Sequence, residues 1–297
     1  MSSVAFIGLG NMGSGMAANL ARAGLTVGAF DLSPTALARA RSSGCAIADS
    51  AAEAVKGASV VITMLPTAAH VREVWRDSVI PNAAPGSLLI DCSTIDVESA
   101  REVAQAATLA GFRAADAPVS GGVAAAEAGT LAFMVGCGAD LFAEVETTLA
   151  PMARTVILAG ESGAGQAAKI CNNMLLGVTM IGVAEAFALA ERLGLDPQRF
   201  FDIASKSSGQ CWSLTSYCPW PGLVPTAPSN RGYEGGFPTA LMSKDLKLAQ
   251  QAAAKVGAST PLGAQAQATY ALFEGLGYGH KDFSALLHLL RGRLEDL

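Results

Sequence analysis

The sequence contains few of the side chains that hold metals, form disulfides or bind nucleic acids. Only three of its 297 residues are histidines, and their spacing is not that of a metal site. Six cysteines include no Cys-x-x-Cys pair, which argues against a disulfide framework in a chain of this length. A net charge of −5 is unfavourable for nucleic-acid binding. We therefore expect no metal, no disulfides and no nucleic-acid partner.

The sequence also lacks an uninterrupted apolar run long enough for a membrane span. Its most apolar stretch covers residues 174–190 and contains Glu185. A transmembrane helix needs roughly 20 apolar residues and rarely tolerates a charge. This stretch predicts a buried central helix and no membrane partner. The first expected strand begins at residue 4, so we expect no targeting segment and a reducing, cytoplasmic compartment.

What the sequence has in abundance is small and apolar residues. Hydrophobic residues make up 51%, and 32 residues are glycine, whereas aromatic residues account for only 6% and charged residues for 15%. This is enough apolar material for a core and excludes a largely disordered chain. The length fits one or two domains. Close packing between small side chains is therefore expected to matter more than bulky side chains.

The first half of the chain alternates short apolar runs with alanine-rich amphipathic segments. Apolar strands without polar alternation are typical of a parallel sheet that is covered on both faces. The alternation predicts a doubly wound α/β domain, a Rossmann fold, over residues 1–162. The runs expected to be strands are residues 4–9, 27–30, 60–65, 88–91, 132–135 and 156–158.

The second half, residues 163–297, contains no convincing strand and predicts an all-helical domain. A stretch rich in Pro, Gly, Ser and Asn, residues 207–237, interrupts it and carries several aromatic side chains. Loops of this length inside a domain are usually functional or disordered, and the aromatic content argues against disorder. The segments expected to be helical are residues 164–193, 197–206, 239–256, 261–276 and 282–293.

The first expected strand runs into a glycine-rich turn. Gly8, Gly10 and Gly13 fit the pattern Gly-x-Gly-x-x-Gly before a helix expected to start near Asn11. In dinucleotide-binding folds these glycines permit a tight turn, an approach to the pyrophosphate and close helix–strand packing. Asp31 ends the second strand, where a carboxylate binds the ribose hydroxyls and repels a 2′-phosphate. This predicts NAD rather than NADP, although Asp31 could instead form a turn before Ser33.

Three further segments carry polar side chains whose role the spacing leaves open. Lys169, Asn172 and Asn173 share one face at the head of the apolar helix, as a solvated helix start or as a lysine held in an apolar cleft. Residues 116–122, Asp-Ala-Pro-Val-Ser-Gly-Gly, form either an anion cradle or a plain turn, and spacing alone favours the turn. For Lys244 and Asp245, the default interpretation is a surface ion pair.

Taken together, these segments resemble the β-hydroxyacid dehydrogenase family from end to end. Residues 8–13, 116–122, 163–173 and 241–249 are similar to its cofactor loop, substrate segment, catalytic segment and lysine region, in the same order. The long loop at 207–237 and the segments 64–66 and 91–94 are similar to those of its 3-hydroxyisobutyrate dehydrogenase branch. One departure is Gly15, where relatives commonly have proline.

The resemblance implies a role for each matching residue. Lys169 would be the general acid/base, and Asn173 would orient the substrate. The residues implied in substrate binding are Ser120, Gly121, Gly122, Trp212, Tyr217 and Asp245. The residues implied in cofactor binding are Gly8, Leu9, Gly10, Asn11, Met12, Gly13, Asp31, Met64, Leu65, Pro66, Thr94 and Lys244.

The activity that the resemblance implies is the NAD-dependent oxidation of 3-hydroxyisobutyrate to methylmalonate semialdehyde, a step of valine catabolism. The alternative is an NAD-dependent dehydrogenase of L-serine or another small 3-hydroxy acid. A third hypothesis is a non-catalytic protein similar to the chromatin-associated members of the family, which lack the catalytic lysine. The presence of Lys169 argues against it. The resemblance further implies a homodimer or homotetramer.

Overall fold

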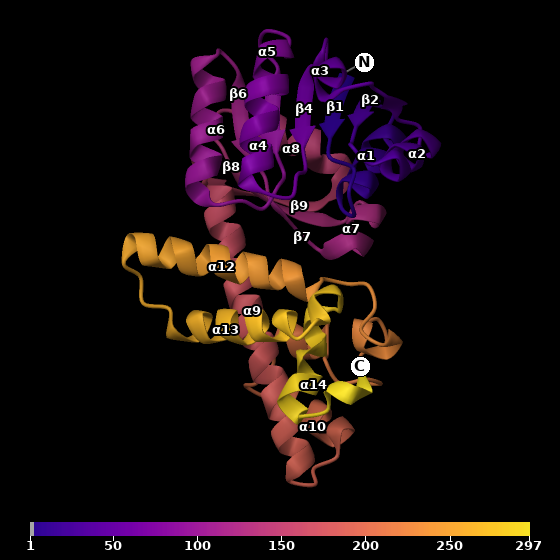
Figure 1. Ribbon diagram of the computed structural model, residues 1–297, viewed down its shortest axis with the longest axis vertical. Helices are drawn as coiled ribbons and strands as arrows, with labels where there is room; N and C mark the ends of the chain where they lie inside the picture. Colours follow the sequence, from indigo (N-terminus) through magenta and orange to yellow (C-terminus); the bar gives the residue numbers. More distant parts are fainter. Residues whose placement is uncertain (1–2) are drawn as a thin grey trace. The chain divides into compact units, whose positions relative to one another are not determined.

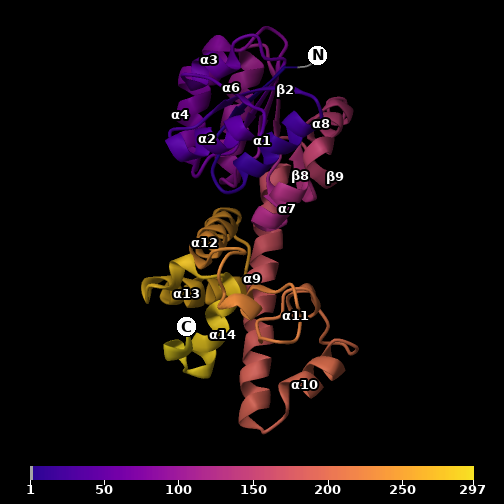
Figure 2. The same cartoon turned by 90° about the vertical axis from the view of Figure 1, so that its right-hand side faces the viewer.

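The computed structural model describes residues 3–297, which divide by their internal contacts into a unit ending at Lys169 and a unit spanning Ile170–Leu297 (Figures 1 and 2). The sequence placed the domain boundary between residues 162 and 163. The strands of the first unit are β1 (Ser3–Ile7), β2 (Thr26–Phe30), β3 (Ala46–Ile47), β4 (Val60–Thr63), β5 (Leu88–Asp91), β6 (Arg113–Asp116), β7 (Val119–Ser120), β8 (Leu131–Gly136) and β9 (Ala153–Gly160).

These strands form one sheet in the order β3-β2-β1-β4-β5-β6-β8-β7, with β9 paired to β8. The helices of the unit are α1 (Gly13–Arg22), α2 (Pro34–Ser42), α3 (Ala51–Val55), α4 (Ala68–Val74), α5 (Ile80–Asn82), α6 (Val97–Leu109), α7 (Gly122–Ala128) and α8 (Phe142–Leu149). A π-helical turn, Trp75–Val79, joins α4 to α5.

Both faces of the sheet are buried, as the apolar strands predicted. On β1, Val4 and Phe6 belong to one core, which includes residues of α1, α2 and α8. Ala5 and Ile7 belong to a second core, which includes residues of α3, α4 and α6. Successive strand residues point to opposite faces, so each strand supplies both cores. The predicted fold class, a doubly wound α/β domain followed by a helical domain, is confirmed.

The sheet is parallel except at one end, where the apolar pattern of the strands did not predict an antiparallel strand. β8 runs antiparallel to β6 and β7, with Asp116 opposite Gly136 and Val119 opposite Phe133. The connection between β7 and β8, residues 121–130, holds only the short helix α7. A parallel crossover needs about a dozen residues or more, so the chain folds back instead. β9 then adds to β8 in parallel.

From residue 163 onward the described residues form helices joined by turns and loops. α9 (Ala164–Arg192) begins in the first unit and continues into the second, which also holds α10 (Pro197–Ala204), α11 (Trp212–Thr215), α12 (Thr239–Val256), α13 (Pro261–Gly275) and α14 (Leu286–Arg291). Residues 282–293 are not one helix, contrary to the prediction. Asp282 caps a 3₁₀ turn (Phe283–Ala285) through the N–H of Ser284. α14 follows this turn and ends at Arg291, before Gly292, whose φ is +68°.

α9 is the central helix of this unit, as Figure 2 shows. Met180 and Ile181 belong to a core shared with α12, α13 and α14. Val183, Ala184 and Phe187 belong to a second core, formed with the loop after α10. Among the described helices, α9 alone has the length and composition to cross a bilayer, and 39% of its most apolar stretch is buried within the structure. Part of the apolar surface of α9 is thus buried in these two cores.

Candidate active site

The glycine-rich turn between β1 and α1 combines tight packing with open space. A Cβ on Gly8, whose φ is +96°, would lie 2.2 Å from the carbonyl oxygen of Met64, and one on Gly13 would lie 1.9 Å from that of Gly8. A Cβ on Gly10 would meet no heavy atom within 4 Å. The first and third glycines are therefore required by packing. The second glycine leaves room for a ligand beside the start of α1, which begins at Gly13 rather than near Asn11.

Asp31 is fixed by backbone N–H groups at the end of β2. Its Oδ2 accepts from Leu9 N at 2.6 Å, and its Oδ1 accepts from Ser33 N at 2.7 Å. The first bond joins the carboxylate to the glycine-rich turn. The second is the turn contact that the alternative interpretation predicted. The turn contact does not exclude binding of the ribose hydroxyls, because each carboxylate oxygen can accept more than one hydrogen bond.

The segments that follow β4 and β5 are joined by a buried hydrogen-bond network. Leu65 N donates to Ser93 Oγ at 2.8 Å, and Ser93 Oγ donates to Asp91 Oδ1 at 2.6 Å. Thr63 Oγ1 donates to the same carboxylate oxygen at 2.7 Å. This network holds together the two segments, 64–66 and 93–94, in which Met64, Leu65, Pro66 and Thr94 were predicted to line the cofactor site.

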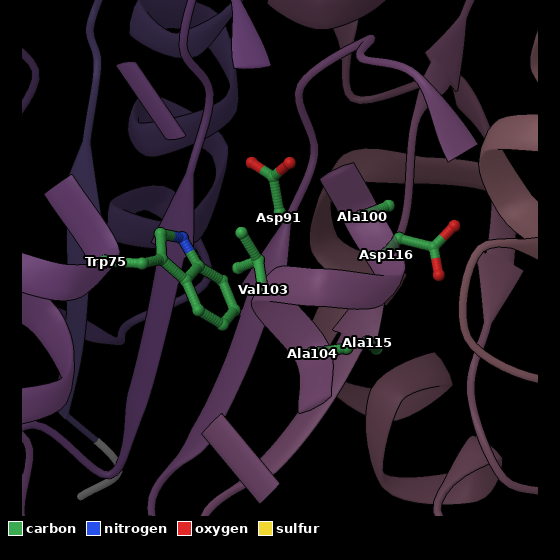
Figure 3. A pocket seen from close by; sticks show the side chains of 7 residues that line it. All are labelled: Trp75, Asp91, Ala100, Val103, Ala104, Ala115 and Asp116. Atoms are coloured by element: carbon green, nitrogen blue, oxygen red, sulfur yellow. The ribbon is translucent and has the colours of Figure 1, made fainter. Parts of the chain in front are cut away.

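Asp91, the first residue of the segment 91–94, is a buried acid. Its side chain borders a cavity of about 10 Å³ together with Trp75 and Asp116 (Figure 3). Asp91 Oδ2 has no hydrogen-bond partner among the described residues. Burial raises the pKa of Asp91 to about 6, and the neighbouring Asp116 carboxylate adds to the rise. Asp91 and Asp116 lie side by side because β5 and β6 pair in parallel register.

Asp116 anchors the start of the helix that carries Lys169. Its Oδ1 accepts from Gly163 N at 2.6 Å, and its Oδ2 accepts from Gln166 N at 2.9 Å. A Cβ on Gly136 would lie 2.3 Å from Asp116 Oδ1, so only glycine leaves room for the carboxylate. Lys169, in the second turn of α9, is only 6% exposed. A solvated surface lysine is thereby excluded.

The segment predicted to hold the substrate carboxylate connects β7 to α7. Ser120 ends β7, and Gly121 and Gly122 have φ values of +134° and +72°. Residues that carry a side chain rarely adopt these backbone conformations, which explains why two glycines stand here. The N–H groups of two successive glycines of this kind are able to contact an anion. The structure thus leaves the cradle interpretation open beside that of a plain turn.

Helix α7 is tied to helix α1 through one side chain. Asn19 Nδ2 donates to Ala126 O at 2.6 Å and to Gly15 O at 2.8 Å. A Cβ on Gly15 would come within 2.8 Å of the Ala126 carbonyl carbon. At position 15, where relatives commonly have proline, glycine therefore lets α1 approach α7 closely. This approach joins the helix of the cofactor loop to the helix of the predicted substrate segment.

The second unit holds the remaining predicted residues. Asn173 Nδ2 donates to Asp245 Oδ2 at 2.6 Å, and Asn172 Nδ2 donates to Asn173 Oδ1 at 3.0 Å. Lys244 Nζ lies 3.9 Å from Asp245 Oδ1. Asn173 and Asp245 are 2% and 3% exposed, so Lys244 and Asp245 are not an ordinary surface ion pair. The amide of Asn173 is held in one orientation by partners on both of its atoms.

Trp212 and Tyr217 form a stack in the long loop. Their ring centroids are 4.8 Å apart, and Tyr217 OH donates to Asp282 Oδ2 at 2.7 Å. Asp282 Oδ2 also accepts from Phe237 N at 2.8 Å. Burial, followed by the Asp282 carboxylate, raises the pKa of the Tyr217 phenol. Tyr217 is thus fixed in a neutral form, while Trp212 remains half exposed.

Comparison with known proteins identifies the family. Residues 3–160 match the family described as the NAD binding domain of 6-phosphogluconate dehydrogenase, and residues 163–290 match that described as NAD-binding of NADP-dependent 3-hydroxyisobutyrate dehydrogenase. The 3-hydroxyisobutyrate dehydrogenase of Pseudomonas aeruginosa is 50% identical, over 99% of this chain and 100% of its own. The chain belongs to the 3-hydroxyisobutyrate dehydrogenase family of β-hydroxyacid dehydrogenases.

Two further relatives match over nearly the whole chain. The NAD-dependent L-serine dehydrogenase of P. aeruginosa is 46% identical, over 97% of this chain and 98% of its own. A solved structure described as Mycobacterium tuberculosis 3-hydroxyisobutyrate dehydrogenase with L-serine has 51% identity and a TM-score of 0.94, covering 98% of this chain and 99% of that one.

These findings confirm the predicted enzyme class and cofactor: the chain is an NAD-binding dehydrogenase of 3-hydroxyisobutyrate dehydrogenase type. The roles of individual residues stay predictions. Asp91, Asp116 and Gln166 lie within segments that match the family, but the sequence predicted no role for them. An acidic residue at the end of each of two neighbouring parallel strands is a signal that would have pointed to the first two. Among residues 3–297 no three His, Cys, Asp or Glu side chains gather as a metal site would require.

Proposed function

We propose that this enzyme oxidises 3-hydroxyisobutyrate to methylmalonate semialdehyde with NAD, as a step of valine catabolism. The observation that carries the proposal is the setting of Lys169, which is buried near the start of a helix anchored by Asp116 in a chain of this family. Relatives named for this activity match over nearly the whole chain, which supports the choice of substrate.

The first unit fits a bound dinucleotide. The open space beside Gly10 and the start of α1 suit the pyrophosphate, and Asp31 suits the adenosine ribose. Residues 8–13, 64–66 and 94 would hold the remainder of the cofactor, with Lys244 toward its nicotinamide. When bound, NAD supplies the acceptor for the hydride that leaves the substrate carbon.

The chain's own residues would manage the proton and the orientation of the substrate. In its neutral form, the Lys169 amine accepts the hydroxyl proton as the carbonyl forms, and in the reverse direction its ammonium donates that proton. Asn173, one helical turn further along α9, orients the substrate through an amide that Asn172 and Asp245 hold fixed. Ser120, Gly121 and Gly122 bind the carboxylate, and Trp212 and Tyr217 shape the pocket.

Replacing Lys169 tests this role directly. Lys169→Ala is expected to lower turnover by about 10²–10⁴-fold, because general acid–base catalysis contributes about that factor. NADH binding, followed by fluorescence titration, is expected to stay close to that of the wild type. Lys206→Ala, at an exposed lysine just after α10, serves as the control and keeps normal turnover. Near-normal turnover in Lys169→Ala would refute the assignment.

The second candidate substrate is L-serine. It shares the carboxylate and the 3-hydroxyl group of 3-hydroxyisobutyrate and differs by an ammonium in place of a methyl group. The serine dehydrogenase relative and the structure described with L-serine favour testing it. A methyl group in an apolar pocket changes specificity by about 1–3 kcal/mol. Measuring kcat/KM for 3-hydroxyisobutyrate, L-serine and 3-hydroxypropionate decides between them, and a clear preference for serine would overturn the main proposal.

We also propose that the enzyme works in the cytoplasm as a homodimer or homotetramer. Six free cysteines suit a reducing compartment. Leu175 and Leu189 of α9 are 62% and 60% exposed, which leaves apolar surface for a second copy of the chain to cover. Light scattering coupled to gel filtration measures the assembly, and a monomer at micromolar concentration would contradict it.

A further inference from the structure

Gln166 is a fully buried amide with a partner on each of its side-chain atoms. It is 0% exposed. Its Nε2 donates to Ser93 O at 2.7 Å, and its Oε1 accepts from Ile95 N at 3.1 Å. Burying an amide is costly unless it is hydrogen-bonded, so a side chain with both ends satisfied specifies one arrangement of the backbone around it. Gln166 therefore fixes the segment 93–95 against the first turn of α9.

The backbone of the same turn is fixed from a second direction. Gln166 N donates to Asp116 Oδ2 at 2.9 Å. A Cβ on Gly165 would lie 2.3 Å from Met134 O and 2.7 Å from Asp116 Oδ2, so α9 starts in close contact with β6 and β8. With its main chain held by Asp116, the Gln166 side chain has little freedom to move away from Ser93 and Ile95. The first turn of α9 is thus rigidly joined to the carboxyl ends of β5 and β6.

The two segments that Gln166 connects carry different parts of the proposed chemistry. Thr94, predicted to line the cofactor site, lies between its two partners, and Ser93 Oγ accepts from Leu65 N. Lys169 follows Gln166 by three residues on α9, so the two side chains are neighbours along the helix. All of these residues belong to the first unit. Movement of the helix relative to the segment 93–95 would therefore move Lys169 relative to Thr94 and the cofactor site that Thr94 is predicted to line.

We propose that Gln166 is a positioning residue, which holds Lys169 in register with the segment 93–95 so that proton and hydride transfer can occur together. The inference rests on the proposed function, since it assigns Lys169 to the proton transfer. Gln166 acts through the backbone of Ser93 and Ile95 and through α9. Its loss should slow the chemical step while the glycine-rich turn and Asp31 continue to bind the dinucleotide.

The test compares the rate and the amplitude of a single turnover. Gln166→Met keeps the side-chain length but removes both hydrogen bonds. Enzyme saturated with NAD is mixed with 3-hydroxyisobutyrate in a stopped-flow instrument, and NADH formation is followed. The rate is expected to fall roughly 10–100-fold, because small misplacements of reacting groups have effects of that size. The KM for NAD is expected to change by less than about threefold, because uniform binding is retained.

The amplitude separates positioning from folding. A variant that is only partly folded gives a smaller amplitude at the wild-type rate, and that result would overturn the proposal, as would a wild-type rate at full amplitude. Ser87→Ala is the matched control. The buried Ser87 hydroxyl lies within hydrogen-bond distance of Ala58 O and Ala84 O at the amino end of β5 and donates its single proton between them, so its loss also removes a buried hydrogen bond. It should lower the melting temperature without changing the rate.

A second variant covers the case in which Gln166→Met does not fold. Gln166→Asn keeps the amide but shortens the side chain by one methylene group, so it cannot reach both Ser93 O and Ile95 N. It is expected to slow the same step, and a wild-type rate would overturn the proposal. If the wild-type enzyme does not oxidise 3-hydroxyisobutyrate, the proposed function fails by itself. The measurement on Gln166 is then made with the 3-hydroxy acid that the enzyme does oxidise.

Discussion

Replacing Asp91 by asparagine should make the stability of the enzyme less sensitive to pH. In the folded protein burial raises the pKa of Asp91 to about 6, against an ordinary value of 3.8. Below pH 3.8 the carboxyl is protonated in both the folded and the unfolded state. As pH rises through 6 the folded protein must hold a buried charge. The shift of about two units corresponds to about 3 kcal/mol of unfolding free energy lost by high pH.

Asp91→Asn removes this loss because the amide does not ionise. Its oxygen can still accept from Thr63 and Ser93 in place of Asp91 Oδ1. The amide nitrogen takes the position of Oδ2, which has no partner among the described residues, at a cost that is the same at every pH. The difference in stability between variant and wild type therefore isolates the charge of residue 91.

The measurement is the melting temperature of both proteins at pH 4.5 and pH 8. About 2 of the 3 kcal/mol develop between these values, which corresponds to about 3 °C for a chain of 297 residues. The melting temperature of the variant, relative to that of the wild type, should thus be higher at pH 8 than at pH 4.5 by this amount. An equal difference at both pH values would show that Asp91 carries no raised pKa, and would refute the reasoning.

Two other substitutions test separate parts of the first unit. Asp31→Ala should reduce the preference for NAD over NADP, measured as a ratio of kcat/KM values, because the repulsion of a 2′-phosphate is lost; a wild-type enzyme that already favours NADP would contradict this. Gly136→Ala should destabilise the fold by about 1–3 kcal/mol, since its Cβ would overlap Asp116 Oδ1. Gly182→Ala, where a Cβ meets nothing within 4 Å, is the control, and equal melting temperatures for the two variants would exclude the overlap.

Much of the fold could be predicted because its signals are local. The strand at Leu88–Asp91 and the helix at Thr239–Val256 have the predicted bounds, since an apolar run and an amphipathic period mark them directly. The antiparallel direction of β8 could not be predicted in the same way. It depends on how far the chain travels between β7 and β8, and strand direction leaves no mark in the residues themselves.

The candidate site was predictable only to the level of its segments. Motifs pointed to Lys169 and to the glycine-rich turn, because their residue types are unusual in their positions. The contacts of Asp116 with Gly163 and Gln166 span 47 and 50 residues, and they follow from the pairing of β8 with both β6 and β9, in which Gly136 lies opposite Asp116 and Gly160. A sequence shows that an acid ends a strand, but which helix it anchors is settled only by the register of the sheet.

The link between α1 and α7 has a consequence for how the chain folds during synthesis. Asn19 bonds to Ala126 across 107 residues. At about 5–20 residues per second, a ribosome needs about 5–20 s to make that span. Until then the amide of Asn19 lacks this partner, and Gly15 has no helix to approach. The cofactor loop is among the first parts of the protein to be made, yet its helix reaches its final packing only after most of the sheet has been translated.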